Sequence, residues 1–315
     1  MVVPTATVSR RNPADLADGE LVASRAEEAY DAYGGQSNSE MIRVCCQSPE
    51  IEEARFMYKR VTNSVSLIVL AVLLLTLPGL IHANTSNRQA DTIQTSRGEL
   101  RLMPLYHGSV MLEFGGMVID VDPWSMGDYT GLPQADLIVV THTHGDHLDR
   151  PMIDKLRKPA LIIVGPPAVI DTLNCAPGCG QVEAISDSEK KTVLGIEIEG
   201  VPMYNLVKGS APGKPFHHKG VGSGYVLNFG DTRVYLSGDS ECTPEMKALK
   251  NITVAFLAMS ESRVSSPTEV AECAKVFKPK IAYPYHYRGS NPQDFANALK
   301  DTGIEVRLRK LEGEP

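Results

Sequence analysis

The sequence has no block of lysine and arginine residues, and its 38 acidic residues against 31 basic ones give a net charge of -7. A protein whose main partner is a nucleic-acid backbone needs a basic face, so this charge balance excludes that class. Six cysteines are too few and too scattered for a disulfide scaffold, and none has C-x-x-C zinc-ribbon spacing. Cys175 and Cys179 flank A-P-G and either close a small disulfide loop in an oxidising compartment or remain free thiols.

Two common catalytic motifs are also missing. The chain has no G-x-S-x-G, which argues against a serine hydrolase. G-V-G-S-G at Gly220–Gly224 is followed by a predicted strand rather than a helix, so it is not a dinucleotide-binding loop.

One long apolar run stands out, from Val65 to Ile81. Lys59 and Arg60 precede it and a small Ala83 follows it, which is the layout of a secretory signal peptide. Such a signal starts a chain, so Met57 is the expected start, and the polar segment 1–56 is a disordered tail or a mis-assigned start.

The alternative for this run is a signal-anchor helix, because about 20 apolar residues cross a bilayer. Either way we expect export to the periplasm or the cell exterior, with membrane contact only through the apolar segment if it stays uncleaved. Segment 57–83 is then the signal or anchor, 84–98 a polar linker, and 99–315 the folded domain.

Short apolar strands alternate with helical patterns throughout 99–315. Glu99–Leu105, Val110–Phe114 and Met117–Val121 predict an early hairpin meander, and Ala135–Val140 predicts a buried strand. A second series of strands and helices, including a helix over Pro267–Phe277, follows. This order predicts an α/β fold of two sheets packed face to face with helices outside.

The chemistry concentrates in T-H-T-H-G-D-H-L-D, directly after the buried strand. Alternate residues His142 and His144 can share one metal ion, while Asp146 and His147 can face a second. Hydrolytic two-metal sites use such a ligand set, with ions about 3.5 to 4 Å apart.

H-x-H-x-D-H, then G-D at Asp239, then a strand ending in His286 resembles the metallo-β-lactamase superfamily. L-Y-H-G-S, V-D-P-W and Y-P-Y-H-Y-R-G are similar to its branch of L-ascorbate 6-phosphate lactonase-like hydrolases. The resemblance covers about 99–311 and implies a four-layer αββα sandwich. It also implies two divalent ions, Zn or Mn, bridged by Asp239. The resemblance further implies five terminal ligands to these ions: His142, His144, Asp146, His147 and His286.

One position departs from that pattern. Where the superfamily usually supplies a third histidine to the first site, this chain has Asn205. Either its amide oxygen completes the site, favouring Mn²⁺ over Zn²⁺, or His217 or His218 folds back from the following loop.

Several residues are candidates for the surroundings of the metals. Arg288 follows His286 by two residues and would contact an anionic substrate, unless it pairs with Asp294; Lys219 would add a second positive charge. His107 either lies near the substrate or is a strand histidine. Asp122 either orients the motif histidines or only ends a strand.

The sequence therefore predicts a dinuclear metallohydrolase with Asp146 and Asp239 as catalytic residues. We expect a metal-bridging hydroxide to attack the substrate. A small anionic ester, lactone or phosphodiester is favoured as that substrate over a β-lactam. The rival hypothesis is an exported metal-binding protein of the same fold without turnover. No nucleic-acid partner is expected, and a homo-oligomer is left open.

Overall fold

The computed structural model describes residues 89–174 and 180–311. The predictions for 1–56 and 57–83, the first part of the predicted linker, and the pairing of Cys175 with Cys179 lie outside the described residues. Among the described residues, no helix is both long enough and apolar enough to cross a membrane.

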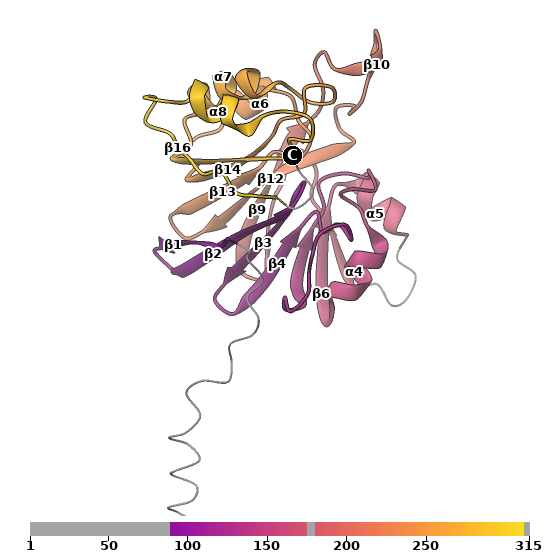
Figure 1. Ribbon diagram of the computed structural model, residues 1–315. Coiled ribbons are helices and arrows are strands. Elements are labelled where there is room, and N and C mark those ends of the chain that lie inside the picture. The colour runs from indigo at the N-terminus through magenta and orange to yellow at the C-terminus, as the bar shows by residue number, and fades with distance from the viewer. Residues whose placement is uncertain (1–88, 175–179, 312–315) are drawn as a thin grey trace, which may run out of the picture. The chain divides into compact units, whose positions relative to one another are not determined.

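The first sheet contains seven strands in chain order, beginning with an antiparallel meander (Figure 1). From the fourth strand onward each strand pairs in parallel with the next. Its strands are β1 (Asp91–Thr95), β2 (Gly98–Tyr106), β3 (Ser109–Phe114), β4 (Met117–Val121), β5 (Ala135–Val139), β6 (Arg157–Gly165) and β7 (Gln181–Ala184).

The second sheet also has seven strands, in the order β16-β15-β14-β13-β12-β9-β8. Strands β13 to β16 run parallel, whereas β8, β9, β12 and β13 pair antiparallel. The strands are β8 (Lys190–Val193), β9 (Ile196–Met203), β12 (Gly222–Phe229), β13 (Thr232–Leu236), β14 (Val254–Ala258), β15 (Ile281–Tyr285) and β16 (Glu305–Val306). A separate hairpin, β10 (Gly209–Ala211) with β11 (Lys214–Pro215), lies between β9 and β12 in the chain.

The apolar residues form two clusters that define the layers. One cluster joins side chains of both sheets and of the helices over the second sheet. The other lies between the first sheet and its two helices (Figure 1). The helices are α4 (Arg150–Leu156), α5 (Pro167–Leu173), α6 (Pro244–Lys247), α7 (Pro267–Phe277) and α8 (Pro292–Ala298). The predicted αββα sandwich is thereby confirmed.

The metal-ligand motif leads from β5 directly into α4. Asp149, its last residue, caps this helix by accepting a hydrogen bond from the Met152 backbone N–H at 3.1 Å, and its other oxygen accepts from Ser125 N–H at 2.8 Å. A capped helix on one side and a buried strand on the other fix both ends of the loop. The intervening histidines are therefore held on a short, anchored segment.

The predicted linker 84–98 needs a correction. Its later part contains β1, which pairs along its whole length with β2. The strand reads D-T-I-Q-T and its burial alternates residue by residue, with Ile93 packed against the core. A half-exposed edge strand with polar outward residues has the composition of a linker, so composition alone did not identify β1 as a strand.

A disulfide absent from the predictions joins Cys242 to Cys273, with Cα atoms 5.7 Å apart. Cys242 lies in the loop after β13, three residues beyond Asp239, and Cys273 is buried in α7. This bond attaches the loop that carries Asp239 to the helix layer above it.

Candidate metal centre

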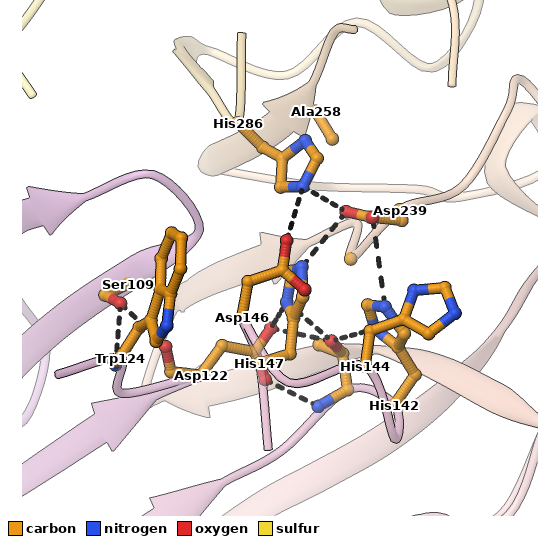
Figure 2. A network of polar contacts seen from close by, with 12 residues as sticks. Ser109, Asp122, Trp124, His142, His144, Asp146, His147, Asp239, Ala258 and His286 are labelled. Carbon is orange, nitrogen blue, oxygen red and sulfur yellow. Dashed lines mark hydrogen bonds and ion pairs between the residues drawn. The ribbon is translucent and has the colours of Figure 1, made fainter. Parts of the chain in front are cut away.

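The candidate ligands follow the carboxyl ends of strands in both sheets. His142 to His147 follow β5, Asp239 follows β13 and His286 follows β15. Because β13, β14 and β15 run parallel, Asp239 and His286 lie at the same edge of the second sheet. Figure 2 shows them pointing toward the histidine loop of the first sheet.

The first ligand group contains His142, His144, His217 and Asp239. The ligand atoms of this group all lie within 4.8 Å of one another. His142 Nε2 is 3.8 Å and His217 Nε2 is 3.5 Å from Asp239 Oδ2, and His217 Nε2 is 3.2 Å from His144 Nδ1. Three imidazoles and a carboxylate form a ligand set suited to a divalent transition metal.

The second ligand group lies on the other side of Asp239. His147 Nε2 is 3.4 Å and His286 Nε2 is 3.3 Å from Asp239 Oδ1. Asp146 Oδ2 extends this group, at 3.9 Å from His286 Nε2 and 3.4 Å from His107 Nε2. Asp239 therefore presents Oδ2 to one group and Oδ1 to the other, as a bridging ligand would.

The burial of these atoms tests whether metal ions fit. Four of them are buried and have no hydrogen-bond partner among the described residues: His142 Nε2, His147 Nε2, His286 Nε2 and Asp239 Oδ1. A buried polar atom without a partner costs free energy, and four that converge on one place need a common ligand. Two divalent ions, one in each group, would satisfy them.

The protonation of three of the histidines, His142, His217 and His286, also suits metal binding. Burial, with the neighbouring histidines, lowers the pKa of His142 well below its usual range. Burial lowers the pKa of His217 and of His286 to about 4 despite the attraction of Asp239. These imidazoles are neutral at pH 7, so each has a nitrogen lone pair to donate.

His147 differs because two carboxylates surround it. Burial acts to lower its pKa, but Asp239 and Asp122 outweigh burial and raise it to about 9. Asp122 Oδ2 accepts a hydrogen bond from His147 Nδ1 at 2.8 Å and another from the Thr141 hydroxyl at 2.6 Å (Figure 2). Asp122 therefore orients His147 so that Nε2 points at Asp239, the role that the sequence left open against a simple strand end.

Asn205 holds a ligand in place. Its amide oxygen accepts from His217 backbone N–H at 2.8 Å and from His217 Nδ1 at 2.7 Å. Its amide nitrogen donates to Glu241 Oε1 at 3.1 Å and to the Arg263 carbonyl at 3.0 Å. Of the alternatives for completing the first site, the geometry favours His217; His218 is exposed and belongs to neither ligand group.

Replacing Asn205 with alanine is expected to weaken metal binding at the first group by about 10-fold to 100-fold, the usual effect of losing a residue that orients a ligand. The reason is that His217 Nδ1 loses its acceptor and the ring can rotate away. Competition with a chromophoric chelator measures the affinity. Asn228→Ala, at a half-exposed position of β12 outside both ligand groups, serves as the control, and equal affinities in both variants would contradict this role.

His107 lies against the second group. Its ring centroid is 3.8 Å from that of His286, and its backbone carbonyl accepts from His286 N–H at 3.0 Å. Both histidines have positive φ angles, 52° and 50°. A left-handed backbone is uncommon in residues other than glycine, and it directs both rings toward Asp146.

A cavity of about 500 Å³ opens over both ligand groups. Arg288 lines it, with its guanidinium carbon 5.8 Å from the Trp124 ring centroid.

The prediction for Lys219 needs a correction. Lys219 does not line this cavity, and its ammonium group pairs with Glu245 at 2.5 Å. Four lining residues were absent from the predictions: Phe216, Ser260, Ser262 and Arg263. The sequence position alone could have indicated Ser260, Ser262 and Arg263 as site residues, because they follow the carboxyl end of β14.

Residues 101–286, more than half of the 315-residue chain, match the β-lactamase superfamily domain. The chain belongs to the β-lactamase superfamily. The crystal structure of a protein from Parabacteroides distasonis, proposed to be a metal-dependent hydrolase, is similar to this chain, with a TM-score of 0.66 and 38% identity. The match covers 71% of this chain and 100% of that one.

Two further relatives extend this comparison. A UPF0173 metal-dependent hydrolase from Methanopyrus kandleri is 26% identical over 228 residues, covering 68% of this chain and 97% of its own length. A metallo hydrolase from the archaeon Ignicoccus hospitalis shares the fold, with a TM-score of 0.57 and 21% identity, over 68% of this chain and 96% of its own. The more specific resemblance to ascorbate-phosphate lactonases stays a prediction.

Proposed function

We propose that this chain is a dinuclear metal-dependent hydrolase that acts on a small anionic ester, lactone or phosphodiester. The proposal rests on the orientation of the Asp239 carboxylate, whose two oxygens face two separate histidine groups. His142, His144 and His217 would hold one ion, and His147 and His286 the other, with Asp146 beside His286 as a further ligand. Bound divalent ions would supply Lewis acidity, polarising the scissile bond and lowering the pKa of water.

The remaining residues would position these groups and the substrate. Asp146 lines the cavity, and the histidines around it hold its pKa far below the ordinary value, against the effect of burial. It is therefore ionised at neutral pH, and its oxygens can accept a hydrogen bond from water or from a bound substrate. His107 Nε2 lies 3.4 Å from Asp146 Oδ2 and would keep that carboxylate in place.

The metal content and a substrate screen test this proposal together. Protein expressed in metal-replete medium is expected to carry about two Zn or Mn ions per chain, measured by elemental analysis, and to lose activity after chelation. Screening with lactones, phosphodiesters and nitrocefin identifies the reaction. Absence of bound metal would refute the proposal, whereas two metals without turnover on any of these classes would favour the metal-binding rival.

Export is part of the proposed function. The apolar run at 65–81 motivates it, and the Cys242–Cys273 disulfide supports it, since disulfides persist in oxidising compartments such as the periplasm. Three histidines in the first ligand group favour Zn²⁺ over Mn²⁺ there, because imidazole suits Zn²⁺ and Mn²⁺ prefers oxygen ligands.

A further inference from the structure

Two arginines line the cavity over the ligand groups, and we propose that Arg263 and Arg288 together bind a dianionic group of the substrate, such as a phosphate monoester. This inference rests on the proposed function, because it concerns the same cavity. It goes further by adding Arg263 and by specifying the charge of the group that is bound away from the reacting bond.

The topology of the second sheet brings the two arginines to one edge. Strands β14 and β15 are parallel neighbours, and their last residues, Ala258 and Tyr285, pair in register. Arg263 and Arg288 follow these strand ends in adjacent loops. A hydrogen bond of 3.2 Å from Glu261 N–H to the Ser290 hydroxyl joins the two loops. The arginines therefore belong to one connected edge, beside His286.

Aromatic rings support both guanidinium groups. The Arg263 guanidinium carbon lies 4.6 Å from the Phe216 ring centroid, and that of Arg288 lies 5.8 Å from the Trp124 centroid. A guanidinium over an aromatic ring is attracted to the ring face and keeps its N–H groups available for a planar or tetrahedral anion. Such support lowers the entropy lost when an anion binds.

The charges of these arginines are not neutralised within the described part of the chain. Five other arginines pair with carboxylates: Arg101 with Glu113, Arg157 with Asp154, Arg233 with Glu199, Arg307 with Glu305 and Arg309 with Asp91. Within 89–174 and 180–311, neither Arg263 nor Arg288 forms such an ion pair. Both are exposed to solvent at the cavity, where a ligand can reach them.

The number of charges favours a dianion. A single guanidinium binds a carboxylate with two parallel hydrogen bonds, so a monoanion needs only one arginine. A phosphate monoester carries a charge of about -1.5 to -2 at pH 7 and has three acceptor oxygens, which can engage both guanidinium groups. Ser260 and Ser262 also line the cavity, and their hydroxyls can donate to the remaining oxygen.

The test measures binding by calorimetry on the metal-loaded protein, with phenylphosphonate as the dianionic probe and benzoate as the monoanionic one. Both are measured above pH 7, where the phosphonate is doubly ionised. Arg263→Gln and Arg288→Gln are each expected to weaken phenylphosphonate binding about tenfold or more, as for a charged hydrogen bond, and benzoate binding by less. Arg101→Gln changes the net charge equally but lies outside the cavity, so its affinities should equal those of the wild type.

Each result decides the proposal. Unchanged phenylphosphonate binding in both glutamine variants would overturn it, since the metals alone would then hold the anion. An equal loss for benzoate would overturn the assignment of a dianion. Arg263→Lys keeps the charge without the two-pronged donor, so an intermediate loss supports the proposal even if Arg263→Gln fails to fold. The titration needs no turnover, so arginine-dependent binding of phenylphosphonate together with failure of the substrate screen would count against the hydrolase and not against this site.

Discussion

Replacing Asp239 with asparagine is expected to remove metal from both ligand groups and to lower kcat/KM by at least about a thousandfold, as for other central catalytic groups. Asp239 has one oxygen toward each group: His142 and His217 face Oδ2, and His147 and His286 face Oδ1. An amide has a similar shape but lacks the negative charge and offers only one oxygen.

Metal content and thermal melting of the purified variant measure the result. Asp231→Asn, at the exposed turn between β12 and β13, is the matched control and should keep two ions and full activity. An Asp239→Asn variant that keeps both ions would show that Asp239 does not bridge the two ions.

His144→Ala removes a ligand from the first group alone. This variant should lose one ion and retain the other.

Replacing Asp120 with asparagine is expected to stabilise the protein at pH 8 by up to roughly 4 kcal/mol, and hardly at all near pH 4. Asp120 lies in β4 between Met111 and Ile138, is 1% exposed, and neither carboxylate oxygen has a hydrogen-bond partner among the described residues. Burial raises its pKa from 3.8 to about 7.

The direction of this effect follows from proton binding. Well below pH 3.8 the carboxyl group is neutral in both the folded and unfolded states and contributes nothing. Between its unfolded pKa of 3.8 and its folded pKa of about 7, the folded state binds more protons, so stability falls as pH rises. Above pH 7 the charge is buried without compensation, and the full cost is present.

Urea unfolding of both proteins over this pH range measures the difference. Asparagine carries no charge, so the variant should lose the downward slope contributed by Asp120. Asp136→Asn is a control of opposite sign, because Lys158 and the Val118 N–H outweigh partial burial and lower the pKa of Asp136. Parallel pH profiles for the wild type and Asp120→Asn would contradict the prediction.

The elements with strong local signals were predictable from sequence. The helix expected over Pro267–Phe277 has those bounds in the structure. Its start is specified by Ser266, which accepts from Glu269 N–H, with the Glu269 carboxylate accepting from Ser266 N–H in return. Both residues are local, so the pattern alone contains the information. The short polar strands β1, β7 and β8 have no such signal, because pairing with a neighbour rather than composition creates them.

The candidate site divides in the same way. The residues of H-x-H-x-D-H are close in sequence, and the structure brings them together with Asp239 and His286. His217 could only be an alternative, because which loop histidine turns inward depends on two hydrogen bonds to Asn205. Arg263 and the Cys242–Cys273 pair depend on contacts between segments far apart in the chain, which spacing does not reveal.

The hydrogen bonds between Asn205 and His217 also close the base of a loop. Besides the side-chain contacts, Asn205 N–H donates to the His217 carbonyl at 3.0 Å, so the chain leaves and returns at one point. Doubling the length of a loop whose ends are fixed costs only about 0.6 kcal/mol in closure entropy. The segment between these two residues can therefore change in length and sequence while the metal ligand stays in place. Phe216, beside Arg263, belongs to this segment, so substrate preference can diverge among relatives without altering the metal centre.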